Sequence, residues 1–471
     1  MKTISGVLLF ILASALYPNP STLLHAAGPA DYNFIMIVVD CLRADHLSSY
    51  GYHRNTSPNI DALAGESAVF TQAIAQAPTT LLSFASIFTS RYVSAHGVNA
   101  LNKALSDSAL TLAEILKIYN YKTAAFMAGL NVNPLFKLNQ GFDVYYQLNY
   151  TSASFKTALP AAFDWAKERN GKGEKFFLVA HGNDLHTPYV FPASGLYDRG
   201  FKVNARLNRL SAPESPLITV YKRKLMLKSE LEVIRLSDDD IGHIVARYDE
   251  GIHYADGLVG DFIRKLRAAK MLDRTILIVT ADHGEGLFDH DYFFHDFNLY
   301  DDTLRVPLII TGPGIGKKEI LQQVRLIDLM PTILDMAGIA PGRDAQGRSL
   351  KSPLYGGETD AAGNEYTFAE SSVGGKVLRS AGWKLIRSPG KTELYDLKKD
   401  PAERTDLAGT EKETADELRK KLSDSLAADA KDALSEALPP GMRFTDNMTK
   451  VDAELREFYK HMPGDRVRPL R

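Results

Sequence analysis

Cysteine is nearly absent from this chain, since Cys41 is the only one among 471 residues. A chain with one cysteine cannot form an internal disulfide, so its stability must come from the size of its hydrophobic core. Hydrophobic residues make up 45% of the chain and charged residues 24%, the composition of an ordinary globular protein. Cys41 itself is interpreted as a small buried residue that fills space in the core.

The chain also has no surplus of charge of either sign. Its 55 Lys and Arg residues nearly balance 57 Asp and Glu residues, which gives a formal net charge of -2. Nucleic acids and anionic membranes select basic surfaces, so neither is an expected partner. The sequence leaves the oligomeric state open.

Beyond the N-terminus no apolar run is long enough to cross a membrane, so no transmembrane domain is expected in the mature chain. The N-terminus has the features of a secretory signal, because Lys2 precedes an apolar core at residues 7–12. Small residues follow at 13–15 and at Ala26-Ala27, and the signal peptide is placed at residues 1–27. An exported protein, periplasmic or extracellular, is therefore predicted, with an uncleaved N-terminal anchor as the alternative.

Continuous apolar runs that end at polar residues predict strands buried on both faces. Helical patterns lie between them, at 112–116, 161–165 and 248–266. This alternation predicts an α/β fold with a mostly parallel central sheet flanked by helices. The clearest strand-like runs cover residues 34–39, 176–180, 275–279 and 306–310, with a weaker one at 123–127.

The texture of the sequence changes after Gly338, and a main domain is assigned to residues 32–340. A small antiparallel C-terminal subdomain is predicted at 341–410, where short strand-like pieces occur at 382–386 and 393–397. A helical C-terminal extension is predicted at 411–471, with its helix from 411 to about 438. Within the main domain, the charged stretch at 198–240 is expected to form an excursion that contains a helix.

Polar side chains follow several of the predicted strands directly. Asp282 and His283 come after one buried strand, and Asp40 ends another. In parallel sheets, ligands bind beyond the carboxyl ends of the strands, so these side chains form a candidate three-ligand metal site. An Asp/His pair suits zinc or manganese better than calcium. Taken singly, each of these residues could also be a plain strand-end cap or polar turn.

Thr80 precedes a run with helical spacing and is expected at or near the N-terminus of that helix. Helix N-termini bind oxyanions, and a hydroxyl beside a metal becomes a usable nucleophile. The alternative is a threonine that only caps the helix. His186 follows a third strand and His295 lies shortly after Asp282; either could instead be a loop histidine bonded to the backbone.

Several segments, in this order along the chain, resemble the sulfatase family of the alkaline phosphatase superfamily. The likeness covers roughly residues 33 to 408. It rests on Asp40-Cys41-Leu42-Arg43-Ala44-Asp45, on Thr80 to Ser90 with His96-Gly97-Val98, on Thr280-Ala281-Asp282-His283-Gly284-Glu285, on Leu304-Arg305-Val306-Pro307-Leu308, on Asp328-Leu329-Met330-Pro331-Thr332, and on Gly382-Trp383-Lys384-Leu385-Ile386 with Glu393-Leu394-Tyr395-Asp396-Leu397.

The resemblance implies an alkaline phosphatase-like fold, with residues 32–340 as the catalytic domain and a divalent metal as the cofactor. It implies that the metal is held by Asp40, Thr80, Asp282 and His283, and that Thr80 is also the nucleophile. His186 and His295 match positions that contact the anionic group of the substrate or protonate the leaving oxygen. For substrate binding, the resemblance points to Asn99, Asn102 and Asp184.

This sequence departs from ordinary sulfatases at the nucleophile. Those enzymes convert a Cys or Ser in Cys-x-Pro-x-Arg to formylglycine, whereas Thr80, Leu82 and Phe84 occupy these positions here. Cys41 replaces the second acid of calcium-binding sulfatases, and His283 replaces an Asn. These differences favour the threonine-using relatives.

The predicted function is therefore a metal-dependent hydrolase of phosphate or phosphonate esters that acts through a covalent Thr80 intermediate. The expected substrate is a small-molecule, glycan or lipid ester that carries an anionic group. The alternatives are a sulfuric ester hydrolase, a transferase of phospho-head-groups, and a non-catalytic binding protein with the same fold.

Overall fold

The computed structural model describes residues 31–148, 154–187, 189, 195–198, 200–202, 219–221, 224–227, 232–296, 298–357, 366–432 and 435–437. The predicted signal peptide lies outside these residues, as does the chain from residue 438 onward. Within the described residues, no helix combines the length and the apolar character needed to cross a membrane.

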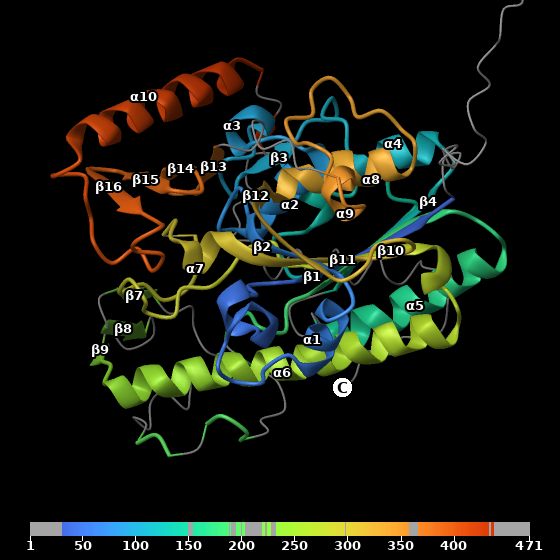
Figure 1. Cartoon of the computed structure of the whole chain (residues 1–471), viewed down its shortest axis with the longest axis horizontal. Coiled ribbons are helices and arrows are strands. Elements are labelled where there is room, and N and C mark those ends of the chain that lie inside the picture. The colour runs from blue at the N-terminus through green and yellow to red at the C-terminus, as the bar shows by residue number, and fades with distance from the viewer. Residues whose placement is uncertain are drawn as a thin grey trace, which may run out of the picture.

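An eight-stranded sheet forms the centre of the molecule, in the order β12-β2-β11-β10-β1-β6-β4-β5 (Figure 1). Only β11 runs against its neighbours, so the predicted mostly parallel sheet is confirmed, and the four clearest runs are neighbours in it. The strands are β1 (Asn33–Val39), β2 (Ala68–Ile74), β4 (Lys122–Ala128), β5 (Val144–Leu148), β6 (Phe176–Gly182), β10 (Thr275–Thr280), β11 (Arg305–Thr311) and β12 (Lys318–Arg325).

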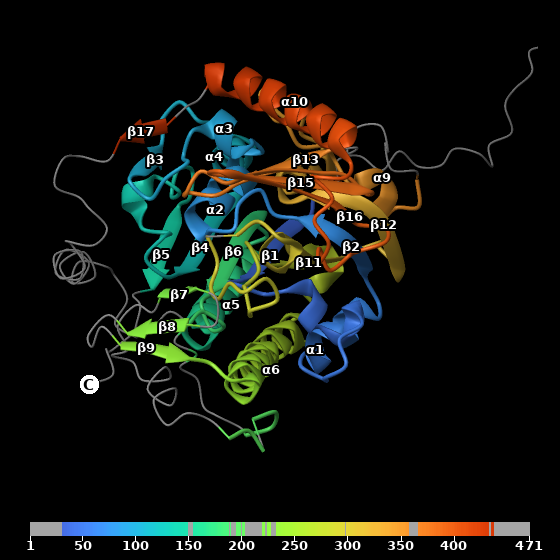
Figure 2. The same cartoon turned by 90° about the vertical axis from the view of Figure 1, so that its left-hand side faces the viewer.

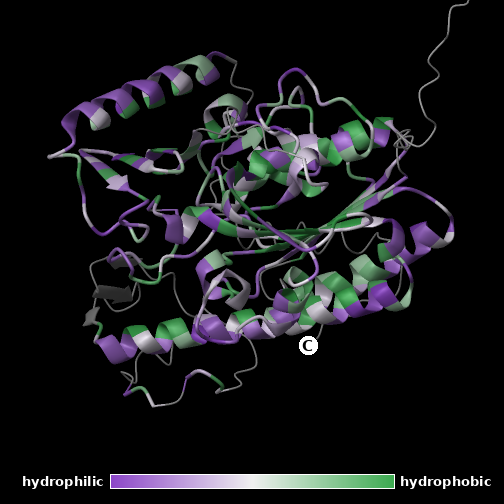
Figure 3. Ribbon diagram, in the orientation of Figure 1, coloured by the Kyte–Doolittle hydropathy of each residue, from purple (hydrophilic) through white to green (hydrophobic). Residues whose placement is uncertain are grey.

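Helices cover both faces of this sheet. In Figure 1, α1, α5 and α6 lie on one side, and α2, α4 and α8 lie on the other. This sandwich buries every residue of β1, β6 and β10, which explains their continuous apolar runs (Figure 3). The helices are α1 (Pro58–Ala64), α2 (Thr80–Thr89), α3 (Val93–His96), α4 (Leu112–Ile118), α5 (Phe155–Gly171), α6 (Asp238–Ala268), α7 (Asp301–Leu304), α8 (Leu329–Met336), α9 (Lys351–Leu354) and α10 (Lys412–Asp429).

A separate antiparallel sheet of four strands follows the main sheet, as the sequence predicted. It contains β13 (Thr367–Glu370), β14 (Lys376–Arg379), β15 (Trp383–Ser388) and β16 (Lys391–Asp396). Helix α10 crosses this small sheet (Figure 2). The buried leucines of this helix recur at every fourth position, at Leu418, Leu422 and Leu426. They pack in one cluster with one leucine from each of β14, β15 and β16, which are Leu378, Leu385 and Leu394.

The prediction of a helix within 198–240 is wrong for the described residues before Asp238, and residues 203–218 of that stretch lie outside the described ones. Three short antiparallel strands occur there, β7 (Thr219–Tyr221), β8 (Lys224–Leu227) and β9 (Glu232–Arg235). Among the described residues, these strands pair with one another and with no other strand. The helical signal belongs to α6, which begins where Ser237 and Asp240 form a capping box.

Buried ions join the two sheets. Lys384 of β15 is fully buried, and its Nζ lies 2.7 Å from Asp301 Oδ1 and 2.7 Å from Glu403 Oε1. Asp301 also accepts hydrogen bonds from Arg379 of β14. The same guanidinium donates to Gln323 Oε1 of β12 over 2.6 Å. Although burial opposes it, the two cations hold the pKa of Asp301 well below its usual range. Burial raises the pKa of Glu403 to about 7, against the effect of Lys384.

A small additional sheet pairs β3 (Lys103–Leu105) with β17 (Ser435–Ala437). Strand β17 follows α10 in the chain, so its pairing with β3 brings the end of the described residues back to the main domain.

Candidate active site

The carboxyl ends of three parallel strands bring the predicted ligands to one edge of the sheet. β1 pairs in parallel with both β6 and β10, so the residues that follow these strands are neighbours. Asp40 comes directly after β1, Asp282 and His283 follow β10, and His181 lies near the end of β6. All four side chains are buried, which creates a polar cluster at the switch from strand to loop.

Helix α2 presents Thr80 to this cluster. Thr80 is the first residue of the helix, and the side chain of the N-cap residue, Thr79, makes no capping hydrogen bond to the first turn. The helix is buried along its whole length, and Ser83 Oγ donates to the carbonyl of Asp282 over 2.7 Å. The free N–H groups of the first turn therefore lie at the cluster, where they favour a bound anion.

The four predicted metal ligands converge around one point. His283 Nε2 lies 3.2 Å from Thr80 Oγ1, 3.5 Å from Asp40 Oδ1 and 3.5 Å from Asp282 Oδ2. His283 Nδ1 donates to the carbonyl of Gly284 over 2.8 Å, so its Nε2 carries the lone pair that faces the other three groups. All four are the ligands predicted from the sequence.

The charges of this cluster fit a divalent cation. Burial, together with the nearby Asp282, raises the pKa of Asp40 well above its usual value. Asp282 Oδ2 and His181 Nε2 are buried without a hydrogen-bond partner in the described structure. Asp40, His181 and Asp282 place one ligand atom each within 4.8 Å of one another. Acids and unpartnered donor atoms packed in this way are satisfied by a metal ion.

The two predicted catalytic histidines lie at the edge of the same cluster. The ring of His295 is 4.5 Å from that of His283 and 5.1 Å from that of His186. His295 Nδ1 lies 3.2 Å from Glu285 Oε1, and burial lowers the pKa of His295 to about 3. His186 is half-buried, and its Nδ1 donates to the carbonyl of Thr187 over 2.7 Å.

The three predicted substrate-binding residues have different surroundings. Asp184 accepts from Ser154 Oγ and, over 2.9 Å, from the backbone N–H of Phe155, so its carboxylate holds the start of α5. Burial raises the pKa of Asp184 to about 6. Asn99 and Asn102 are exposed between α3 and β3. A role in substrate binding stays a prediction for all three.

Cys41, His181 and Glu285 also belong to the cluster, although the sequence analysis gave no chemical role to them. Glu285 is fully buried, and burial raises its pKa to about 7. Cys41 donates its thiol hydrogen to Asp40 Oδ1 over 3.2 Å. Each residue adjoins a predicted ligand or ends a strand run, and that adjacency is the signal that could have identified it.

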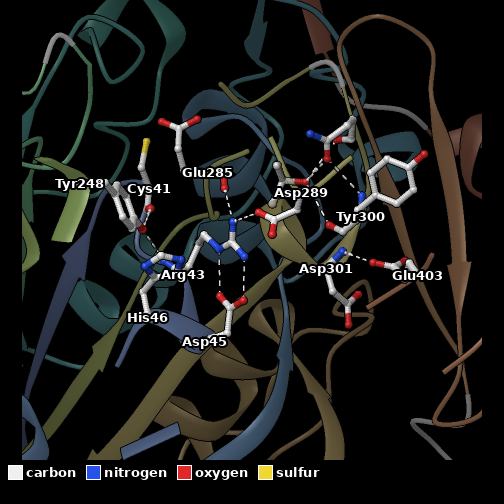
Figure 4. Close-up of polar contacts among 12 residues, drawn as sticks. Cys41, Arg43, Asp45, His46, Tyr248, Glu285, Asp289, Tyr300, Asp301 and Glu403 are labelled. Atoms are coloured by element: carbon white, nitrogen blue, oxygen red, sulfur yellow. Dashed lines mark hydrogen bonds and ion pairs between the residues drawn. The ribbon is translucent and has the colours of Figure 1, made fainter. Parts of the chain in front are cut away.

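Tyr248 and Arg43 support the turn that carries Cys41 (Figure 4). Cys41 has a φ of 62°, a conformation that is uncommon outside glycine. Tyr248 fixes the peptide groups that follow Cys41. The Tyr248 hydroxyl donates to the Cys41 carbonyl over 2.7 Å and accepts from the N–H of Arg43 over 2.9 Å. The buried Arg43 guanidinium forms ion pairs with Asp45 and Asp289 over 2.7 and 2.6 Å. Such support fixes the orientation of the ligands.

Asp296 connects the start of α2 to the small sheet. Its Oδ1 accepts from Thr79 Oγ1 and its Oδ2 accepts from Ser372 Oγ, each over 2.6 Å. Its backbone N–H also donates to the carbonyl of Pro78 over 3.0 Å. Ser372 lies between β13 and β14, so the residue before Thr80 is anchored to the C-terminal sheet.

This fold and site are those of a known family. The Sulfatase family profile matches residues 32–339, which is more than half of the chain, and the chain therefore belongs to the sulfatase family. A second profile, described as N-sulphoglucosamine sulphohydrolase, C-terminal, matches residues 287–432. The family resemblance drawn from the sequence motifs is confirmed.

Three relatives illustrate the range of this family. Arylsulfatase K of Mus musculus is 27% identical, over 52% of this chain and 49% of its own length, so the chain spans about half of that relative. The Delta 4,5-hexuronate-2-O-sulfatase of Bacteroides thetaiotaomicron is 24% identical, over 80% of this chain and 84% of its own. The crystal structure of the phosphonate monoester hydrolase of Agrobacterium radiobacter shares the fold, with a TM-score of 0.66, 21% identity, and coverage of 86% of this chain and 97% of that one.

Proposed function

We propose that this protein is a metal-dependent hydrolase that cleaves phosphate or phosphonate esters through a covalent intermediate on Thr80. The observation that carries the proposal is the position of the Thr80 hydroxyl. It lies at the uncapped start of a buried helix and 3.2 Å from His283 Nε2. A hydroxyl at a helix N-terminus and inside a cluster of ligands is suited to attack an anionic ester.

Asp40, Asp282 and His283 would hold a divalent cation, with Thr80 as a fourth ligand. Zinc or manganese suits this mixture of oxygen and nitrogen donors better than calcium does. A bound cation would supply positive charge that lowers the pKa of the Thr80 hydroxyl and balances the charge of the ester. His181 would support the same ligands, because its Nε2 lies 3.9 Å from Asp282 Oδ2.

In the first step, Thr80 Oγ1 gives up its proton to solvent and forms a bond to phosphorus as the bond from phosphorus to the leaving oxygen breaks. The free N–H groups of the first turn of α2 would stabilise the charge on the remaining oxygens. In the second step, the oxygen of a water molecule attacks phosphorus, and the bond to Oγ1 breaks. The attacking water gives up a proton, Thr80 Oγ1 takes one up, and the product leaves as a phosphate monoester or phosphonate anion.

We assign the proton for the leaving oxygen to His186. Its ring is half-buried, and its Nδ1–H is bonded to a carbonyl, so Nε2 is the nitrogen that exchanges protons. The low pKa of His295, about 3 because of burial, keeps that ring neutral and makes it a poor acid at neutral pH. The role of His295 in proton transfer, implied by the family resemblance, is therefore given to His186.

The substrate class separates this proposal from its closest alternative. Threonine has one hydroxyl and cannot form the hydrated aldehyde of formylglycine, so its covalent ester has to be hydrolysed by external water. Phosphodiesters or phosphonate monoesters are placed first because the site residues resemble those of the threonine-using relatives. The printed name of one structural neighbour is that of a phosphonate monoester hydrolase. Sulfate esters are the second candidate, because the curated relatives are named as sulfatases.

A panel of aryl substrates tests the reaction class. We expect turnover of a phosphodiester or a phosphonate monoester to exceed turnover of the matching sulfate ester, and to require zinc or manganese after chelation. Expression without a formylglycine-generating enzyme should leave this activity unchanged, because Thr80 needs no modification. Faster sulfate turnover would transfer the assignment to the sulfuric ester hydrolases, and no turnover by metal-loaded protein would favour a binding protein.

We also propose that the protein is exported to the periplasm or the extracellular space. The support comes from Lys2, the apolar residues 7–12 and the small residues Ala26-Ala27. N-terminal sequencing of protein recovered outside the cytoplasm would read a new N-terminus near residue 27 if the signal is removed, and Met1 if the segment remains as an anchor.

A further inference from the structure

Two buried side chains beside Asp40 (Cys41 and Glu285) and the half-buried His295 have no part in the reaction proposed above. Cys41 Sγ lies 3.2 Å from Asp40 Oδ1 and 3.7 Å from His295 Nδ1. The same Nδ1 lies 3.2 Å from Glu285 Oε1. A thiol, an imidazole and a carboxylate thus meet at one point, next to the ligands of the first cation.

The spacing of these atoms is that of ligands around one metal ion. Zinc binds nitrogen and oxygen at about 2.0–2.1 Å and sulfur at about 2.3 Å. In a tetrahedron with these bond lengths, neighbouring nitrogen and oxygen atoms are about 3.3 Å apart, and nitrogen and sulfur are about 3.6 Å apart. The distances of 3.2 Å between His295 and Glu285 and 3.7 Å between His295 and Cys41 agree with both values.

An unpartnered oxygen supplies an independent sign of a missing ligand. Glu285 is fully buried, and its Oε2 has no hydrogen-bond partner in the described structure. Figure 4 shows its carboxylate and the Cys41 sulfur directed to the same side of the network around Arg43. A buried oxygen without a partner loses its hydration and destabilises the folded protein, and a bound cation removes this cost.

The geometry points to a second cation position beside the first, formed by Cys41, Glu285 and His295, with Asp40 shared between the two positions. The inference rests on the first cation proposed for Asp40, Asp282 and His283, and it extends that site to a two-metal centre. A thiolate, an imidazole and a carboxylate together select zinc over calcium or magnesium. Two adjacent cations also favour the more highly charged phosphate or phosphonate group over sulfate.

Cobalt substitution of the full-length protein tests this position without any assay of activity. Cobalt(II) takes the place of zinc, and a cobalt–thiolate bond gives a charge-transfer band in the near ultraviolet. On titration of the chelator-stripped protein, we expect two equivalents of cobalt to bind, with the thiolate band tied to one of them. Elemental analysis of zinc-loaded protein should likewise give two ions per chain.

Two histidines of one loop provide a matched pair of variants. His295→Gln and Cys41→Ser should each bind one ion in place of two, and Cys41→Ser should also lose the thiolate band. His290→Gln should keep both ions, because the His290 ring stacks on Tyr300 at 3.7 Å and is not among the proposed ligands. Circular dichroism confirms that each variant is folded.

The outcomes distinguish this inference from the function on which it rests. A wild-type protein that binds one ion without a thiolate band overturns the second position and leaves the proposed hydrolase intact. One ion with a thiolate band also overturns it, since Cys41 would then bind the first cation. A wild-type protein that binds no ion removes both proposals.

Discussion

Thr80→Ala should lower kcat by about a thousandfold or more, because it removes the nucleophile of the proposed reaction. The metal should remain bound, since Asp40, Asp282 and His283 keep their ligand atoms. Steady-state kinetics on the best substrate of the aryl panel, with metal content measured on the same samples, gives the comparison. Thr80→Ser restores a hydroxyl and should recover a large part of the turnover.

The matched control for this experiment is Thr89→Ala at the other end of the same helix. Thr89 is also buried, and its hydroxyl donates to the carbonyl of Ala85, so its removal perturbs α2 without touching the site. Thr89→Ala should keep most of the activity. If Thr80→Ala retained full activity while Thr89→Ala lost it, the helix would matter for its packing alone, and Thr80 would not be the nucleophile.

Lys384→Ala should destabilise the protein by about 3–5 kcal/mol, because it leaves buried acids without their cation. The amine of Lys384 is fully buried, and it lies 2.7 Å from both Asp301 and Glu403. Urea denaturation followed by circular dichroism measures the change. Lys376→Ala in the neighbouring strand is the control, since its pair with Glu370 is partly exposed and contributes about 0–1 kcal/mol.

The deficit of Lys384→Ala should also depend on pH. The pKa of Glu403 in the folded protein, about 7, is above its ordinary value, so its contribution to stability is present at low pH and is lost as the pH rises through the folded pKa. Without Lys384 this pKa rises further, so the variant should lose more stability at pH about 8 than at pH about 5. A deficit that is equal at both pH values would mean that Glu403 is not paired with Lys384.

The central strands could be predicted from the sequence because burial on both faces leaves an unbroken apolar run. Two strands at the other side of the sheet could not. Strand β2 mixes buried and half-buried residues. Strand β12 lies at the edge of the sheet, and four of its first five residues are exposed or half-buried. The direction of β11 was also beyond prediction, because an apolar run is the same read from either end.

The part of the site that lies at strand ends could be predicted from the sequence. Asp40, Asp282 and His283 directly follow buried strands, so their meeting follows from a parallel sheet. Thr80 required the family resemblance, because nothing local specifies where a helix will place its first residue. Cys41, Glu285 and His295 meet through the paths of two loops, and loop paths are set by contacts such as those of Arg43 that are distant in sequence.

Asp296 couples the two sheets of this protein mechanically. One carboxylate is bonded to Thr79, which precedes the proposed nucleophile Thr80, and to Ser372 of the C-terminal sheet. A mutation that moved the outer sheet would therefore displace the start of α2, although it lay outside the candidate active site. Exchange of the C-terminal unit between homologues should consequently alter that site, and a transplanted unit must bring a partner for Asp296 with it.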